Sequence, residues 1–334
     1  MWVLLYVARR LGTVILQNSR MNFATSAVPN PLPATFLRGG TSKGIFLNKS
    51  TLPADQAEWG PTSIFRGIMG SPDAEYGRQL NGMGGGVSSL SKIMVVFTPT
   101  PERKAQGIDV EYTFVQVGIR DSSIDYSGNC GNLTSMIGVY ALDEGMCHPP
   151  LGSSSATIRC FNTNTEKIID TTFPISETGI PILDLPEAAV GGVPGKASTI
   201  LLDFVNPGGA RTGKLLPSGQ PIDNLKLPLS PTGSVRASLV DATNPTVFVD
   251  YTELNKFLPI DDYFNGKPAA IQEVSPVLED IRQQGAIKMN LDPTAQAQPK
   301  IAILSVPRSE SDAADNVNIV IHALSMGILH KAFR

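Results

Sequence analysis

The spacing of glycine and proline limits this chain to short elements of secondary structure. The sequence holds 31 glycines and 26 prolines in 334 residues, and both residue types interrupt helices. Between them lie short apolar runs rich in β-branched side chains, which is typical of strands bounded by turns. We therefore expect many short strands, and a long helical bundle is disfavoured.

Short β-branched runs predict strands along most of the chain. They cover residues 34–37, 45–47, 93–97, 110–119, 199–205, 235–239, 247–249, 301–306 and 317–323. The clearest helix pattern starts near Asn129 and ends near Leu142, with apolar side chains at three- and four-residue spacing. A second helix is expected at 274–283, and weaker ones at 54–66 and 253–257.

The length and composition favour two domains. A typical domain has roughly 150 residues, and 42% apolar residues suffice to bury two cores. Prolines and glycines gather between Pro181 and Lys196, which predicts a junction there. We therefore assign residues 1–30 to an N-terminal extension, 31–190 to a first half and 191–334 to a second half.

The charge and cysteine content exclude several classes of partner. The 27 basic and 30 acidic residues give a net charge of −3, which argues against a nucleic-acid partner. No apolar run reaches the roughly 18 residues that cross a bilayer, so no membrane partner is expected. The three cysteines and three histidines lack disulfide-framework and metal-ligand spacing. We predict no metal and a reducing compartment.

The N-terminal region has an unusual charge distribution. The first 54 residues contain no Asp or Glu, while Arg9, Arg10 and Arg20 lie among apolar and hydroxyl residues. This composition is typical of a mitochondrial transit peptide. Alternatively, translation starts at Met21 and the protein is cytoplasmic. Under either interpretation we expect residues 1–30 to lie outside the fold.

A cysteine lies at the start of the best predicted helix. The segment Ser127–Asn132 (SGNCGN) places Cys130 there, where free backbone N–H groups favour a thiolate or a bound carboxylate. The flanking glycines let a ligand approach the backbone. The alternative is a buried structural cysteine. We favour a functional role for Cys130 and structural roles for Cys147 and Cys160.

Glycine also combines with hydroxyl and cationic side chains in three loops. They are Arg38–Gly44 (RGGTSKG), Asn81–Lys92 (NGMGGGVSSLSK) and Gly208–Gly219 (GGARTGKLLPSG). A strand rather than a helix follows the second loop, which disfavours a nucleotide site. Each loop alone could be a solvated turn, but together they are suited to bind anions. The expected partner is a small molecule with several carboxylates.

These motifs, in their order along the chain, resemble the PrpF family. The resemblance includes Asp241–Pro245 (DATNP) and Ala323–Gly327 (ALSMG), and it extends from about residue 34 to the end. It implies the α+β fold of diaminopimelate epimerase: two pseudo-symmetric halves, each a curved mixed or antiparallel sheet around a central helix. The active site is then expected in the cleft between them. In the family a second helix follows the ALSMG segment, so the second half is expected to be incomplete at its C-terminal end.

The resemblance also implies an activity. It points to a cofactor-independent isomerase that shifts a double bond, or changes its cis/trans geometry, in an unsaturated tricarboxylate such as aconitate or 2-methylaconitate. Cys130 and Lys92 take the positions of the acid/base pair, and which one is the base stays open. A 1,3-proton shift requires groups at two carbons and a cleft that stabilises negative charge. The residues expected to bind substrate are Arg38, Thr41, Ser42, Lys43, Gly86, Ser88, Ser89, Asn129, Gly131, Asn132, Arg211, Thr212, Lys214, Ser218, Gly219, Asn244 and Met326.

Two alternative functions stay open at this point. One is an amino-acid epimerase or racemase of the same fold, which normally carries one cysteine in each half; here no cysteine follows Cys160. The other is an inactive polycarboxylate-binding or truncated member of the family. The oligomeric state is also open, with a homodimer as one option.

Overall fold

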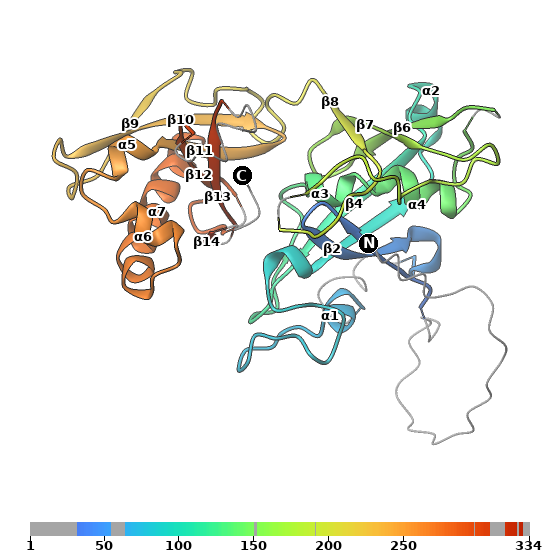
Figure 1. Cartoon of the computed structure of the whole chain (residues 1–334), viewed down its shortest axis with the longest axis horizontal. Coiled ribbons are helices and arrows are strands. Elements are labelled where there is room, and N and C mark those ends of the chain that lie inside the picture. The colour runs from blue at the N-terminus through green and yellow to red at the C-terminus, as the bar shows by residue number, and fades with distance from the viewer. Residues whose placement is uncertain are drawn as a thin grey trace.

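The chain folds into two α+β halves that lie side by side, each with its own sheet and core (Figure 1). This computed structural model describes residues 32–54, 64–149, 152–190, 192–296, 298–307, 318–325 and 327–329. The predicted extension, residues 1–30, lies outside the described residues. None of the helices within those ranges is both long enough and apolar enough to cross a membrane.

The first half contains an eight-stranded sheet. Its strands are β1 (Thr35–Gly39), β2 (Ser42–Asn48), β3 (Lys92–Phe97), β4 (Val110–Val117), β5 (Ile124–Asp125), β6 (Ser155–Asn162), β7 (Lys167–Pro174) and β8 (Leu201–Val205). They follow the order β1-β2-β3-β4-β6-β7-β8, and β5 pairs with β4. The pairs β2–β3 and β4–β6 are parallel, which makes the sheet mixed.

The predicted helix of the first half forms as two short helices, α3 (Gly131–Thr134) and α4 (Ile137–Asp143). The interruption has a local cause, because the Ser135 hydroxyl donates to the Asn132 carbonyl at 2.7 Å. In a continuous helix that carbonyl would accept from Met136, which bonds to Leu133 instead. Both helices pack against the sheet, α3 on β1 and β2, and α4 on β4, β6 and β7. They form the central helical element that the resemblance implies.

Smaller helices complete the first half. They are the 3-10 turns η1 (Lys49–Thr51) and η3 (Ser88–Leu90) and the helices α1 (Ile64–Met69) and α2 (Pro101–Ala105). The turn η3 leads directly into β3, so the glycine-rich loop is followed by a strand as predicted.

The second half contains a six-stranded sheet with helices on one face. Its strands are β9 (Asp223–Lys226), β10 (Ser234–Ala242), β11 (Asn244–Asp250), β12 (Lys300–Ser305), β13 (Val320–Ser325) and β14 (Ile328–Leu329), and its helices are α5 (Tyr251–Leu254), α6 (Ile260–Phe264) and α7 (Pro268–Lys288). The order is β14-β13-β12-β11-β10-β9. Strands β11 and β12 are parallel, and the three helices form the crossover between them.

The two faces of this second sheet have different surroundings. Val247 and Val249 of β11 are buried in the core that α7 covers. Because side chains alternate along a strand, Thr246 and Phe248 point to the opposite face, where they line a cavity. The described residues place no helix on that opposite face. The mixed sheets and their helices confirm the predicted α+β class.

Several elements differ from the sequence-based prediction. The patterns missed the paired strands β6 and β7, and they shortened α7 at both ends. Strand β8 pairs with β7 and so belongs to the first sheet, although it follows the junction predicted near residue 190. Much of the weaker helix predicted at 54–66 lies outside the described residues.

The close packing of α4 on the sheet generates a stability prediction. A Cβ atom on Gly138 would overlap the side chains of Thr171 and Phe173, so Gly138→Ala should lower the free energy of unfolding by about 1–3 kcal/mol. Gly67 in α1 has nothing within 4 Å of such an atom, so Gly67→Ala should be neutral or stabilising by about 1 kcal/mol. Urea denaturation of both variants measures the difference, and equal stabilities would contradict this packing.

Candidate active site

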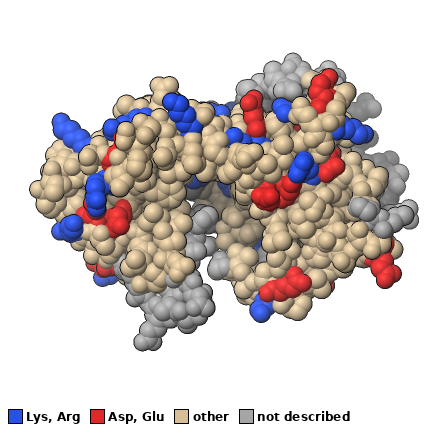
Figure 2. All heavy atoms as spheres, turned by 90° about the horizontal axis from the view of Figure 1, so that it is seen from above, with Lys and Arg blue, Asp and Glu red and all other residues tan. Residues whose placement is uncertain are grey.

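A cavity of about 510 Å³ lies between the two halves and is lined by residues of both. Figure 2 shows the molecule hollowed between its lobes, with basic and acidic side chains interspersed over the visible face. The volume is in the usual range for a small-molecule site. Nine of the predicted site residues line the cavity: Ser42, Ser88, Ser89, Lys92, Asn129, Cys130, Gly131, Asn132 and Asn244.

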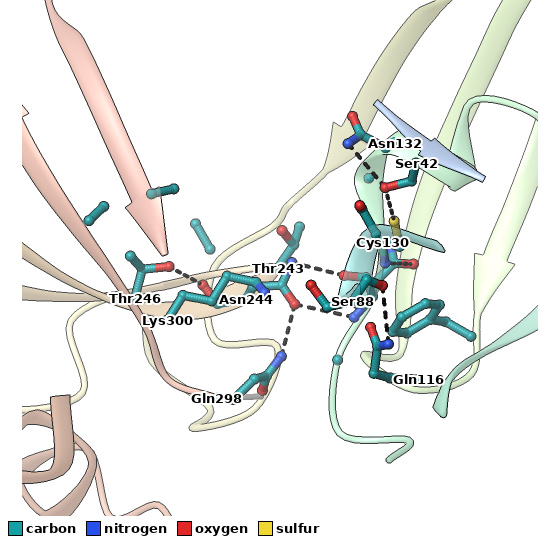
Figure 3. Close-up of a pocket in the computed structure, with 18 of the residues that line it drawn as sticks. Ser42, Ser88, Gln116, Cys130, Asn132, Thr243, Asn244, Thr246, Gln298 and Lys300 are labelled. Atoms are coloured by element: carbon teal, nitrogen blue, oxygen red, sulfur yellow. Dashed lines mark hydrogen bonds between the residues drawn. The ribbon is translucent and has the colours of Figure 1, made fainter. Parts of the chain in front are cut away.

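Cys130 immediately precedes helix α3, as the sequence predicts. Its backbone N–H donates to the Asn129 side chain at 2.8 Å, and its carbonyl accepts from the Thr134 N–H at 2.9 Å. The sulfur lies 3.7 Å from the Ser42 hydroxyl on β2, and the residue is 9% exposed (Figure 3). The thiol is thus held at the cavity wall by groups from two elements.

Lys92 is the first residue of β3 and is 8% exposed. Its ammonium donates to the side-chain oxygen of Gln116 at 2.6 Å and lies 5.1 Å from the centre of the Phe114 ring. Burial lowers the pKa of Lys92, whereas the nearby Cys130 and Asp125 raise it. These two neighbours therefore favour the charged form of Lys92 and oppose the effect of burial.

Gln116 fixes the surroundings of Lys92. Its amide nitrogen donates to the backbone carbonyls of Ser88 at 3.2 Å and Ser91 at 2.9 Å. These two bonds orient the amide so that its oxygen faces the ammonium. Sequence reasoning missed Gln116, and the signal was a polar residue inside the apolar run of β4.

Asn244 joins the second half to the segment that carries the thiol. Its side-chain oxygen accepts from the Asn129 N–H at 3.2 Å, and its amide nitrogen donates to the Asn129 carbonyl at 3.3 Å. Gln298 donates to the same oxygen at 2.8 Å. Figure 3 shows the bond between Gln298 and Asn244. Asn244 therefore links the halves beside Cys130.

A second lysine, which sequence reasoning also missed, lines the cavity from the second half. Lys300 starts β12 and is paired in register with Thr246 of β11. Burial, together with the positive charge of Lys92, lowers the pKa of Lys300 to about 8, although Cys130 and Asp125 oppose the shift. Its only sequence signal was a lysine at the start of a strand pattern.

The structure does not bring the loop at 208–219 to the cavity. The loop does bind an anion, but that anion is a carboxylate of the chain itself. The backbone N–H groups of Arg211 and Thr212 donate to the Asp241 side chain at 2.8 and 2.7 Å. Ser218 donates to Asp223 at 2.6 Å. Four other predicted residues, Arg211, Thr212, Lys214 and Gly219, are likewise absent from the described cavity lining.

The other two loops reach the cavity only in part. In the first hairpin Ser42 lines it, whereas Arg38, Thr41 and Lys43 do not. Arg38 donates to the Gly40 carbonyl at 3.2 Å, and Thr41 accepts from Asn132 at 3.0 Å, so both contribute to the local structure.

In the glycine-rich loop, Ser88 and Ser89 line the cavity but Gly86 does not. The Gly86 N–H donates to the Gln79 side chain at 3.0 Å, and a positive φ of 70° explains the glycine. Met326 lies outside the described residues. Among the residues described, no three His, Cys, Asp or Glu side chains gather in a way that could hold a metal.

Comparisons with known proteins identify the class. The model of the family described as "PrpF protein" matches residues 30–334. The chain is 33% identical to the 3-methylitaconate isomerase of Eubacterium barkeri, over 90% of this chain and 78% of that protein. It is also 33% identical to the 2-methyl-aconitate isomerase of Shewanella oneidensis, over 90% and 77%.

Comparison of the fold with solved structures identifies the same class of protein. The crystal structure of a methylitaconate-delta-isomerase superposes with a TM-score of 0.66 at 32% identity, covering 91% of this chain and 77% of that one. These similarities, with a cavity that holds a cysteine and a lysine, identify the class of protein as an isomerase. The chain belongs to the PrpF family.

The site predicts selective chemical modification. Burial raises the pKa of Cys147 to about 12 and also raises that of Cys160, so both thiols stay protonated near neutral pH. Iodoacetamide at pH 8 should therefore label Cys130, and peptide mass spectrometry should locate the label there. Cys130→Ser should abolish the reaction and Cys147→Ser should leave it unchanged. Predominant labelling of Cys147 would contradict the prediction.

Proposed function

We propose that this enzyme isomerises an unsaturated tricarboxylate, aconitate or 2-methylaconitate, by an allylic proton shift. The observation that carries the proposal is the convergence of Cys130 and Lys92 on one cavity from two separate elements. The relative named 3-methylitaconate isomerase supports an allylic shift in an unsaturated polyacid, and the relative named 2-methyl-aconitate isomerase supports a tricarboxylate substrate. So does a relative named 4-oxalomesaconate tautomerase in Pseudomonas putida, 30% identical over 83% of this chain and 71% of that protein.

The two side chains divide the proton transfer between them. The Cys130 thiolate removes a proton from the carbon next to the double bond, and the C–H electron pair moves into a dienolate spread over a carboxylate. Lys92 then donates a proton to the carbon two positions away, and the double bond forms at its new place. The thiol returns its proton to the neutral lysine, which restores the starting state. No electrons are gained or lost, and protons balance.

The surroundings of Lys92 support its role as the acid. Burial lowers its pKa, which makes the ammonium a stronger proton donor. Its bond to the neutral Gln116 oxygen orients the ammonium without a compensating charge. Because the ammonium itself is buried, the same positive charge stabilises the dienolate.

The epimerase alternative has less support. Epimerisation by two thiols requires a cysteine on each side of the substrate, but all three cysteines of the chain precede residue 161. Among the described residues that the second half contributes to the cavity, there is a lysine, Lys300, and no cysteine.

Removal of either group tests the mechanism. Cys130→Ser and Lys92→Ala should each slow isomerisation about 10²-fold or more, the usual effect of losing an acid/base group. Proton NMR of aconitate or 2-methylaconitate in heavy water measures turnover and shows which carbon exchanges. Cys147→Ala is the matched control and should retain wild-type turnover. Wild-type rates in either Cys130 or Lys92 variants would remove that residue from the mechanism.

The pH profile tests the assignment of Lys92. Gln116→Glu places a carboxylate 2.6 Å from the ammonium and should raise the pKa of Lys92 by about 1 to 3 units. Because a donor must be protonated, loss of activity on the basic side should move to higher pH by a similar amount. The exposed Gln106→Glu is the control and should leave the profile unchanged. A basic limb that stays in place or moves to lower pH would contradict the assignment.

A further inference from the structure

Lys300 is a charged group in the cavity that proton transfer by Cys130 and Lys92 does not use. It lies at the start of β12, on the face of the second sheet that α7 does not cover. Figure 3 shows its side chain extending from the second half toward the first, beside Asn244. Thr246, its partner in the strand register, lies on the same face.

The ammonium of Lys300 has no partner within the described protein. Within the ranges that the structure covers, no carboxylate lies within 4 Å of it and no group forms a hydrogen bond with it. Lys92, by contrast, is held by Gln116 at 2.6 Å. A half-buried cation without a partner loses hydration and gains no compensating bond. Such a group is suited to receive an anion that enters the cavity.

The charges around the cavity favour a carboxylate as that anion. Lys92 and Lys300 are the cations of its described lining, and Asp125 is the one acidic residue there. An ionised tricarboxylate carries a charge of about −3, which Lys92 alone would leave largely unbalanced. The two lysines lie in different halves, so an anion bound between them would be contacted from both halves.

We propose that Lys300 is a substrate-binding residue that pairs with one carboxylate of the tricarboxylate across the cavity from Cys130. This inference rests on the proposed substrate class but not on turnover. The titratable groups that face Lys300 are Lys92 from β3, Cys130 from the start of α3 and Asp125 from β5. Of these, Lys92 adds to the attraction for the substrate and Asp125 opposes it.

Binding of a substrate analogue tests the proposal without catalysis. Tricarballylate is a saturated tricarboxylate and has no double bond to shift, so isothermal titration calorimetry at pH 7 reports binding alone. Lys300→Met should weaken binding about 10-fold or more, the usual effect of losing a charge-assisted bond. Lys300→Arg should stay within about fivefold of wild type. Lys226→Met, which removes an exposed lysine of β9, should bind as wild type does.

The pH dependence provides a second measurement that needs no Met variant. Because the pKa of Lys300 is about 8, its charge is lost as pH rises through that value. Wild-type affinity should therefore fall between pH 7 and pH 9, whereas Lys300→Arg stays charged and should show a smaller fall.

The results of these binding measurements either support or overturn the role of Lys300 in substrate binding. If Lys300→Met binds tricarballylate within about twofold of wild type, the proposal is overturned. If that variant binds normally but loses turnover, the proposal is also overturned, because Lys300 would then act in proton transfer instead. Failure of the wild-type chain to bind tricarballylate would also overturn it. If the wild type binds tricarballylate in a Lys300-dependent way but leaves aconitate and 2-methylaconitate unchanged, the proposed function fails and the role of Lys300 stands.

Discussion

The burial of one ammonium group determines how the rest of the site is built. Moving a cation out of water is costly unless hydrogen bonds replace its hydration. At Lys92 this need is met by Gln116, a neutral side chain whose amide is fixed by two backbone carbonyls. Since the acceptor is uncharged, the positive charge stays available to the thiol and to a bound anion. A carboxylate at position 116 would bind the ammonium more strongly and leave it a weaker acid.

The glycine-rich loops show how a correct chemical motif can serve the protein's own structure. The loop at 208–219 binds an anion, but the anion is Asp241, a buried residue of β10. Likewise, Asp73 accepts the N–H groups of Arg78 and Gln79 in the segment before the glycine run. Satisfying these donors internally fixes the two segments. Of the three glycine loops, the hairpin reaches the cavity with Ser42 and the glycine-rich loop with Ser88, Ser89 and Lys92, whereas the loop at 208–219 does not line it.

The two halves contribute different chemistry to the cavity. The first half supplies the thiol and the ammonium of the proposed acid/base pair, and the second supplies Lys300 and the amide of Asn244. The reciprocal bonds between Asn244 and the backbone of Asn129 couple the halves next to the thiol. A substrate held between the two lysines would therefore be positioned by both sheets at once.

The sequence by itself determined the local features: most of the strands, the start of a helix at Cys130, and the strand that Lys92 begins. These follow from apolar periodicity and turn residues, which act over a few positions. The strands β6 and β7 were missed because neither is a continuous apolar run: buried and more exposed positions alternate along much of both, which is itself a strand signal.

Tertiary structure decided which polar groups share a cavity. Gln116 and Lys300 lie 184 residues apart, in separate halves, and reach one cavity only because β4 and β12 face each other across it. The same holds for Arg211 and Thr212, whose donors look free in the sequence until β10 brings Asp241 to them. Local propensity cannot report such pairings, because the partner of a polar group is set by sheet register and by packing between distant segments.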